Sequence, residues 1–267
     1  MAEIPILGNF HKIDPAIILV KSFFGGKMKN LLKAFVLGLL VLAVAGSCAS
    51  KKPVHAGNLP KVSKYIAFTF NDGPSENTNE LLDILKEYDA KATFFVMGNK
   101  LGMDRYSSIA QRIFEEGHEI ANQAYLHVSL EEESTRAPIR DNIGKAQEAI
   151  KEITGSETIL FRPPNLSRSE LVDAVAREMG LIYIGGYNVR DWDVSDVGPT
   201  TIYETVLENA KDGQIFILHD FGNNNTLPVM ADILWDLRTK GFGFVTVSEL
   251  IALKKAKTTP GEWYDSF

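Results

Sequence analysis

The run Tyr65-Ile66-Ala67-Phe68-Thr69-Phe70-Asn71-Asp72-Gly73-Pro74 begins like a β-strand and then stops abruptly. Its first six residues are mostly β-branched or aromatic, which favours an extended conformation. Gly73 permits backbone angles that other residues avoid, and Pro74 cannot donate a hydrogen bond to a neighbouring strand. Asn71 and Asp72 are therefore expected at the carboxyl end of a strand, where α/β proteins commonly keep their chemistry.

From Tyr65 onward, strand-like and helix-like patterns alternate along the chain. Further strands are predicted at 92–97, 118–122, 158–162, 182–184, 215–219 and 242–247. Helices are predicted at 76–88, 106–116, 130–153, 170–179, 201–210, 227–240 and 249–256. About seven apolar strands joined by helices predict an α/β fold with a parallel sheet, curled into a partial (β/α) barrel. An open doubly wound sheet is the alternative, although no glycine-rich phosphate loop supports a nucleotide site in it.

Two serines match the pattern of a helix N-terminal capping box, in which a glutamate follows three residues later. They are Ser129, followed by Glu132, and Ser167, followed by Glu170. In a capping box the two side chains satisfy backbone amides at the start of the helix. The sequence therefore predicts helix starts near both serines.

The composition favours one folded domain and excludes a nucleic-acid-binding surface. The chain has 267 residues, of which 45% are hydrophobic, and this is enough to bury the core of a domain of about 200 residues. Its formal net charge is -6, and its basic residues are interspersed with acidic ones. The sequence therefore has no cluster of basic residues that would bind nucleic acid. Nothing in the sequence identifies a protein partner.

The N-terminal region resembles a bacterial lipoprotein signal. A short basic segment from Met28 precedes an apolar run that extends from Ala34 to Gly46 and leads into Ser47 and Cys48. Such a run is too short to span a bilayer but suits the core of a signal peptide. We therefore expect residues 28–47 to be cleaved, Cys48 to carry the lipid anchor, and the protein to be exported and membrane-anchored in the cell envelope. An ordinary signal peptide with an incidental cysteine, or an uncleaved anchor, is the alternative.

These signals divide the chain into five predicted parts. Residues 1–27 lie upstream of the signal peptide and are interpreted as a non-native extension of the reading frame. Residues 48–64 are polar, contain prolines and form a predicted tether. The folded domain is predicted at 65–256, and residues 257–267 are predicted to be a C-terminal tail.

Five predicted strand ends carry polar groups that would meet on one face of the sheet. They contribute Asn71 and Asp72; Asn122, Gln123 and His127; Arg162, Pro164 and Asn165; Asp191 and Trp192; and His219 and Asp220. Because parallel strands end on the same side, such residues commonly build the active site of a barrel enzyme. His118 begins its strand rather than ending it, so we expect it to be structural.

The same residues carry a resemblance to the polysaccharide deacetylases of the NodB-homology type. The resemblance covers residues 64–253. It rests on Thr69-Phe70-Asn71-Asp72-Gly73-Pro74, Glu116-Gly117-His118-Glu119-Ile120-Ala121-Asn122-Gln123-Ala124-Tyr125-Leu126-His127, Phe161-Arg162-Pro163-Pro164, Asp191-Trp192 and Ile217-Leu218-His219-Asp220. The resemblance implies a partial barrel that hydrolyses N-acetyl groups on amino-sugar polymers such as chitin or peptidoglycan.

In that family an aspartate and two histidines hold a divalent metal, usually zinc, and the metal activates a water molecule. The resemblance places Asp72, Gln123 and His127 at these ligand positions. It makes His219 the general acid and Asn71 the counterpart of the general base. Arg162 and Asp191 would orient the base and the acid. The implied substrate-binding residues are Pro164, Asn165 and Trp192, and the aromatic rings of Trp192, Tyr187 and Phe221 suit stacking against sugars.

Two departures from the family pattern fall on the chemistry itself. Asn71 replaces the basic aspartate and has no usable proton affinity near neutral pH, whereas Gln123 replaces a metal-binding histidine by a poorer ligand. Two further asparagines, Asn188 and Asn165, stand where an aspartate and an aromatic residue are usual. The candidate substitute bases nearby in sequence are Asp191, Asp193, Asp220 and Glu119.

The sequence therefore leaves two functions open for a carbohydrate-facing protein. One is a metal-dependent deacetylase impaired by Asn71 and Gln123. The other is a catalytically inactive family member that binds cell-envelope carbohydrate.

Overall fold

The computed structural model describes residues 59–192, 195–222 and 225–267. The predicted signal peptide and residues 48–58 of the predicted tether, which include Cys48, lie outside these residues, as does Asp193. The described residues belong to one compact unit that extends from Gly57 to Phe267. Among them, no helix combines the length and the apolar character that a membrane crossing requires.

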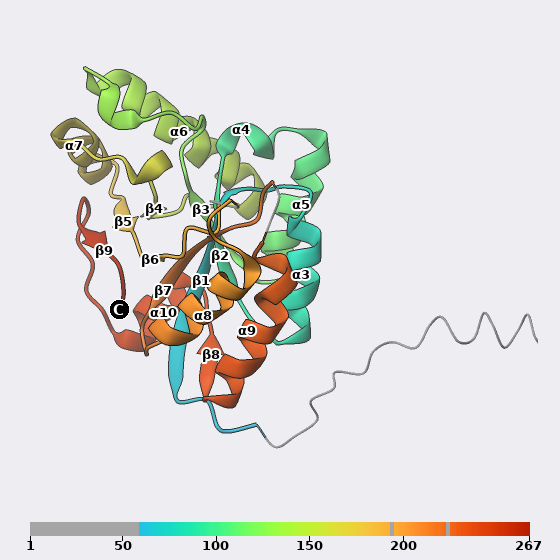
Figure 1. The fold of residues 1–267 in the computed structure, drawn as a ribbon. Helices are drawn as coiled ribbons and strands as arrows, with labels where there is room; N and C mark the ends of the chain where they lie inside the picture. The colour runs from blue at the N-terminus through green and yellow to red at the C-terminus, as the bar shows by residue number, and fades with distance from the viewer. Residues whose placement is uncertain (1–58, 193–194, 223–224) are drawn as a thin grey trace, which may run out of the picture. The chain divides into compact units, whose positions relative to one another are not determined.

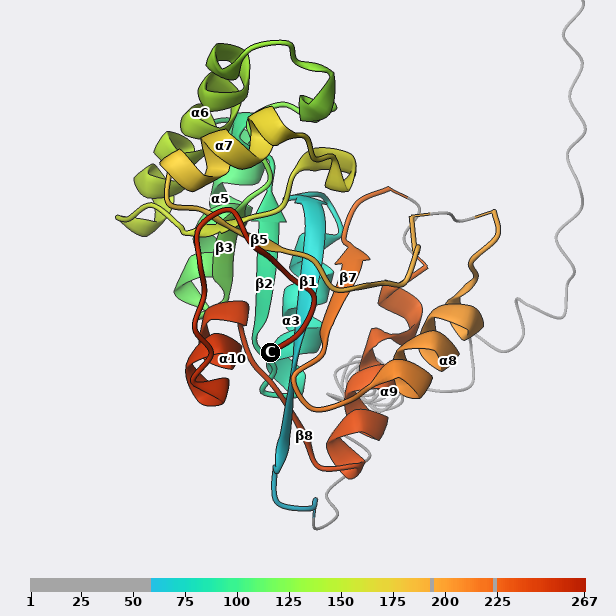
Figure 2. The same cartoon turned by 90° about the vertical axis from the view of Figure 1, so that its left-hand side faces the viewer.

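The core of this unit is a curved sheet of parallel strands (Figures 1 and 2). The strands are β1 (Lys64–Gly73), β2 (Ala92–Val96), β3 (Glu119–Asn122), β4 (Leu160–Phe161), β5 (Ile182–Ile184), β6 (Tyr187–Asn188), β7 (Ile215–His219), β8 (Phe242–Phe244) and β9 (Trp263–Tyr264). Their hydrogen-bonded order is β6-β7-β1-β2-β3-β4-β5-β9, and β8 pairs with the start of β1. The predicted parallel, partial barrel is confirmed, with the short strands β6 and β9 added at its two edges.

Helices pack around the curved sheet, most of them on its outside, whereas α10 (Val247–Lys254) contributes to the core on its inner face (Figure 2). They are α3 (Thr78–Glu87), α4 (Gly98–Leu101), α5 (Asp104–Glu115), α6 (Arg136–Thr154), α7 (Glu170–Glu178), α8 (Pro199–Asn209), α9 (Leu227–Thr239) and α10 (Val247–Lys254), with 3-10 turns η1 (Leu130–Glu132) and η2 (Pro164–Leu166). Every long helix predicted from the sequence is present except the one over 130–153. That segment is divided into η1 and α6.

The alternation of side chains along β1 explains how the sheet is buried on both faces. Phe68 and Phe70 belong to the outer core cluster, which packs against α3, α5, α8 and α9. Ala67 points the other way, into an inner cluster that also contains residues of α10. Successive strand residues face opposite sides, so Thr69 and Asn71 share the inner face with Ala67. The strand thereby delivers Asn71 to the inside of the barrel at its carboxyl end.

The two predicted capping boxes are not formed. Ser129 precedes η1 without a side-chain cap, and the N-cap of α7 is Ser169, which accepts a hydrogen bond from the backbone amide of Val172. Ser169 takes this place because α7 begins only at Glu170, two residues later than a cap at Ser167 requires. The capping box that the structure contains lies at α10, between Thr246 and Glu249.

The C-terminal residues pack onto the sheet. Strand β9 pairs with β5, and Ser266 forms a bridge with Gln214, which directly precedes β7. Asp265 Oδ1 accepts hydrogen bonds from the Trp263 indole at 2.7 Å and from the Gly186 amide at 2.9 Å. Gly185 must be glycine here, because a Cβ atom would lie 2.1 Å from Asp265 Oδ1. The C-terminal segment therefore supports the backbone that follows β5.

His118 directly precedes the first residue of β3. It therefore lies away from the strand ends that carry the polar groups. Its Nδ1 accepts a hydrogen bond from the amide of Ala92, and its ring packs edge-on against Phe94. Burial lowers the pKa of His118 to about 4, since the charged imidazolium loses its hydration. The residue is 5% exposed and serves the core, as the sequence indicates.

We predict that His118 makes the free energy of unfolding fall as the solution is acidified. Between pH 6.5 and 4 the unfolded chain binds a proton that the folded chain does not, so His118 contributes a loss of about 3 kcal/mol, at about 1.4 kcal/mol per pKa unit. Urea denaturation at pH 7 and pH 4 measures this effect, with His118→Asn as the reference because an asparagine oxygen can still accept from Ala92.

Comparing the wild type with His118→Asn separates the pH dependence of stability that is due to His118 from that due to Asp220. The two contributions have opposite signs. Burial raises the pKa of Asp220 to about 6, so its stabilising contribution is lost as the pH rises through that value. Asp220 is the same in both proteins. The stability advantage of the wild type over His118→Asn should therefore shrink by about 3 kcal/mol between pH 7 and pH 4; an advantage that stays constant would contradict this assignment.

Candidate active site

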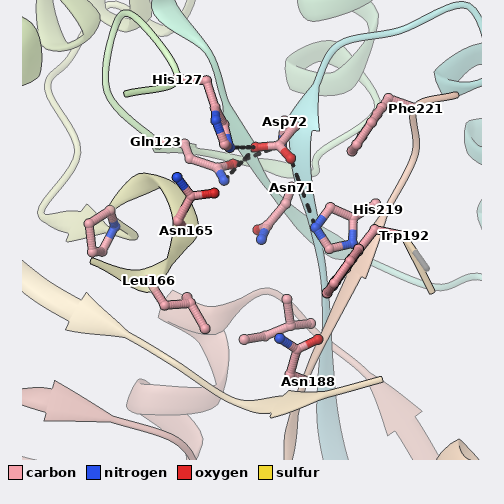
Figure 3. Close-up of a pocket in the computed structure, with 12 residues that line it drawn as sticks. Asn71, Asp72, Gln123, His127, Asn165, Leu166, Asn188, Trp192, His219 and Phe221 are labelled. Carbon is pink, nitrogen blue, oxygen red and sulfur yellow. Dashed lines mark hydrogen bonds and ion pairs between the residues drawn. The ribbon is translucent and has the colours of Figure 1, made fainter. Parts of the chain in front are cut away.

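The polar strand ends meet at a pocket of about 420 Å³. Figure 3 shows its lining residues converging from separate elements. They are Asn71 and Asp72 after β1; Gln123 and His127 after β3; Pro163, Asn165 and Leu166 around η2; Asn188 and Trp192 in and after β6; and Ile217, His219 and Phe221 in and after β7. Most of the site residues expected from the sequence are therefore brought together. Pro164 is buried in η2, and its neighbours Pro163 and Asn165 line the pocket in its place.

Asp72 lies at the centre of the polar side of the pocket. Gln123 Nε2 donates to Asp72 Oδ1 at 2.6 Å, and the backbone amide of Asp72 donates to Gln123 Oε1 at 2.8 Å. His127 Nε2 lies 3.4 Å from Oδ1, and His219 Nε2 lies 3.9 Å from Oδ2. The hydrogen bond with Asp72 raises the pKa of His127. Three nitrogen-bearing side chains therefore surround one carboxylate.

His219 is held by Asp191 in the geometry of an oriented acid. Its Nδ1 lies 2.7 Å from Asp191 Oδ1, and its backbone amide donates to Asp191 Oδ2 at 2.8 Å. Thr226, at the start of α9, also donates to Asp191 Oδ2, at 2.6 Å. Since Asp191 holds Nδ1, the ring directs Nε2 toward the pocket. Asp191 does not line the pocket, so any effect of Asp191 on a ligand would pass through His219.

Asn71, which the resemblance places at the position of the base, faces Arg162. Arg162 Nη1 donates to Asn71 Oδ1 at 2.8 Å. The oxygen of Asn71 therefore already accepts a hydrogen bond. The amino group of Asn71 is the part of the carboxamide that is available to a ligand in the pocket. An amide nitrogen has no proton affinity near neutral pH, so Asn71 cannot take a proton from water.

Arg162 is fully buried behind Asn71. It also donates to the carbonyl oxygens of Ile184 and Gly185 and to the hydroxyl of Thr69, at 2.7 to 2.8 Å. Its guanidinium lies 4.0 Å from the centre of the Phe95 ring. Burial lowers the pKa of Arg162 to about 9, and the more distant charges of Asp72 and Asp265 partly oppose this. All hydrogen-bond acceptors that surround it in the structure are uncharged.

The nearby carboxylates that the structure describes do not replace the missing base. Asp191 is engaged by His219 and Thr226. Asp220 is completely buried beneath Gly73, and Thr78 donates to its Oδ2. Glu119 lies at the opposite end of β3, where it binds Ser248 and Thr93. None of these three carboxylates lines the pocket.

The donor set also falls short of the three-ligand zinc site that the resemblance implies. Protein zinc sites use three or four His, Cys or carboxylate ligands, and Asp72 and His127 supply two. Gln123 would have to supply the third, but its oxygen is turned to the amide of Asp72. Within the ranges that the structure describes, no group of three or more His, Cys, Asp or Glu residues could hold a metal ion.

Two residues that support the site carry no motif in the sequence. Thr226 is one; the other is Lys100 in α4, whose Nζ donates to the carbonyl oxygen of Asp72 at 2.6 Å and to that of Pro74 at 3.3 Å. Burial lowers the pKa of Lys100, although Asp220 and Asp72 oppose that effect. These two hydrogen bonds from Lys100 fix the backbone of the turn that follows β1 and carries Asp72. Asp72 itself adopts a left-handed conformation with φ of 63°.

Comparison with known proteins identifies relatives of this arrangement. A family model described as polysaccharide deacetylase matches residues 58–184. A peptidoglycan-N-acetylglucosamine deacetylase of Bacillus cereus is 35% identical over 205 residues, which cover 73% of this chain and 92% of that protein. A bifunctional xylanase/deacetylase of Pseudobutyrivibrio xylanivorans is 36% identical over 222 residues, which cover 83% of this chain but 36% of the relative's length.

Solved structures with the same fold include the CE4 domain of a multidomain xylanase from the hindgut metagenome of Trinervitermes trinervoides. It has a TM-score of 0.72 and 33% identity, and the match covers 76% of this chain and 98% of that domain. A family 4 acetyl xylan esterase from Clostridium thermocellum, in complex with a cobalt ion, has a TM-score of 0.71 and 31% identity, with coverage of 76% and 98%. A mutant of a CE4-family pseudoenzyme with restored activity has a TM-score of 0.64 and 25% identity, with coverage of 71% and 68%.

These matches agree with the curved parallel sheet and with the motifs gathered at its strand ends. The Bacillus cereus relative exceeds 30% identity over nearly its whole length. The chain therefore belongs to the polysaccharide deacetylase family.

Proposed function

We propose that this chain binds N-acetylated amino-sugar polymers of the cell envelope and that its hydrolysis of their N-acetyl groups is strongly impaired. The observation that carries the proposal is the hydrogen bond from Arg162 to Asn71 Oδ1. It leaves an amino group, which cannot act as a base, at the position where the reaction needs a proton acceptor. Loss of general-base catalysis alone lowers a rate by about 10² to 10⁴.

The pocket keeps the features that suit an uncharged sugar. Trp192 and Phe221 lie on either side of His219 in Figure 3 and are 51% and 38% exposed. Their rings can stack on the apolar face of a pyranose. Three further carboxamides, from Asn71, Asn165 and Asn188, line the same space, and such groups can pair with hydroxyl and acetamido groups. The relatives named as peptidoglycan deacetylases support a glycan of the cell envelope as the ligand.

The location in the cell envelope belongs to the same proposal. Residues 28–47 have the features of an export signal, and the small residues before Cys48 suit lipidation of that cysteine. A lipid-anchored domain on a short tether would face the cell-wall glycan.

The test is glycan binding and acetate release measured on the same full-length preparation. We expect saturable binding of N-acetylglucosamine oligomers by calorimetry, with little acetate released. Trp192→Ala should weaken binding about 10-fold, equivalent to about 1.4 kcal/mol, because stacking on one sugar ring is lost. Phe114→Ala is the matched control, since Phe114 is an exposed aromatic residue outside the pocket. Equal binding by the wild type and Trp192→Ala would contradict the proposal.

A second candidate, a working deacetylase, is favoured by the intact pair of Asp191 and His219. Its signature would be rapid acetate release that His219→Ala abolishes. In that case the chain would be an enzyme whose water loses its proton without a dedicated carboxylate.

A further inference from the structure

We propose that Gln123 takes the place of the metal ion, so that this pocket binds its glycan without a divalent cation. The proposal has a metal part, that no divalent cation binds, and a glycan part, that the glycan binds without one. The metal part rests on the geometry around Asp72 alone, whereas the glycan part also rests on the proposed function above. In this arrangement the carboxamide of Gln123 satisfies Asp72 by hydrogen bonds.

The orientation of the Gln123 carboxamide is determined by its two partners. Its Oε1 accepts from the backbone amide of Asp72 at 2.8 Å, and its Nε2 donates to Asp72 Oδ1 at 2.6 Å. Turning the group over would place its oxygen against a carboxylate and its amino group against an N–H, so both contacts would become repulsive. Gln123 is 2% exposed, and its side chain therefore has little access to alternative partners in solvent.

This orientation opposes a cation in two ways. The oxygen of Gln123, its one possible metal ligand, is occupied by a backbone donor. Its amino group, which carries partial positive charge, lies against Asp72 Oδ1, where a cation would otherwise bind. A zinc ion would retain Asp72 Oδ2 and His127, which is fewer than the three protein ligands that such sites require.

The remaining groups can hold a sugar directly. Asp72 Oδ2 lies 3.9 Å from His219 Nε2, and both side chains line the pocket (Figure 3). A carboxylate oxygen can accept from a hydroxyl or acetamido N–H, and the imidazoles of His127 and His219 can bond to the other polar groups of the sugar. The ligand class is an uncharged N-acetylated pyranose, bound through these side chains and the aromatic rings.

The metal part is tested with zinc alone. The full-length chain, Gln123→His and Gln111→His are dialysed against micromolar zinc, and the bound metal is measured by mass spectrometry. Gln111 is exposed on α5, so Gln111→His controls for the histidine itself. We expect about one zinc more per chain in Gln123→His than in the other two proteins. One zinc per chain in the wild type, lost on addition of EDTA, would overturn the inference.

A second variant keeps the test decisive if Gln123→His folds poorly. Gln123→Glu preserves the shape but places a second carboxylate against Asp72, so this variant should require a cation. Its melting temperature should rise with added zinc, because a ligand that binds the folded state stabilises it, whereas that of the wild type should not change. A zinc-dependent rise in the wild type, as large as that in Gln123→Glu, would count against the inference.

The glycan part is tested by calorimetry in EDTA and in zinc. We expect the wild-type Kd for N-acetylglucosamine oligomers to change less than twofold between the two conditions. Binding that disappears in EDTA would overturn the metal-independent mode. No binding in either condition, together with a zinc-free wild type, would contradict the proposed glycan function and leave the metal inference supported.

Discussion

Replacing Asn71 by aspartate and Gln123 by histidine together should raise acetate release from N-acetylglucosamine oligomers at least ~100-fold. Asn71→Asp supplies a carboxylate at the position where Arg162 already donates, and general-base catalysis contributes about 10² to 10⁴ in rate. Gln123→His supplies the third metal ligand beside Asp72 and His127. His219, the residue expected to act as the acid, is already held by Asp191. The measurement is the initial rate of acetate release with zinc present.

The single variants and a matched double control show whether both changes are needed. Each single change should give a small part of the gain, because the base and the metal act on the same water molecule. Asn79→Asp with Gln111→His makes the same chemical changes on exposed helical positions and should leave the rate unchanged. If the site double variant gains neither zinc nor rate, the assignment of Asn71 and Gln123 to the base and ligand positions is wrong.

The central strands β1, β2 and β7 were predictable because each is long enough for its composition to stand out. β1, β2 and β7 contain at least five residues each and are rich in phenylalanine, isoleucine or threonine. Strands β6 and β9 have two residues each, too few to display any alternation. Both depend on neighbours that are distant in sequence, since β6 pairs with β7, and β9 pairs with β5.

The predicted helix over 130–153 was wrong for a reason that the sequence contains. A continuous helix would place Pro138 in its interior, where proline lacks the amide for a hydrogen bond and its ring clashes with the preceding turn. In the structure α6 begins at Arg136, so Pro138 falls in its first turn, where the amide has no helical partner. The predicted helix over 130–153 and the observed α6 share the same apolar periodicity. Pro138 is the feature that distinguishes them.

The residue types of the site were predictable, but the direction of its amide groups was not. The positions of Asn71 and Gln123 follow from the motifs around them. Which atom of each carboxamide faces the pocket depends on Arg162 and on the backbone of Asp72, which only the fold brings into contact. Thr226 and Lys100 were missed for the same reason, because a single threonine or lysine far from any motif carries no local signal.

Arg162→Met should lower the free energy of unfolding by about 3 to 5 kcal/mol. The substitution keeps much of the side-chain volume but leaves buried acceptors without a donor: the carbonyl oxygens of Ile184 and Gly185 and the side-chain oxygens of Thr69 and Asn71. Each buried polar group that loses its partner costs about 1 to 3 kcal/mol, and the desolvation of the guanidinium that the substitution removes offsets part of the sum. Urea denaturation at pH 7 measures the difference.

Combining Arg162→Met with Asn71→Asp distinguishes a charge effect from a packing effect. With Arg162 present, Asn71→Asp should stabilise the protein by about 1 to 2 kcal/mol, because a buried guanidinium gains a charged acceptor. In the Arg162→Met background the same change should destabilise it, since it buries a carboxylate without a partner. Asn79→Asp beside the partly exposed Arg112 is the reference, and an exposed pair contributes at most about 1 kcal/mol. If Asn71→Asp has the same effect in both backgrounds, Arg162 holds the strand ends together by shape and neutral hydrogen bonds, and its charge is incidental to the fold.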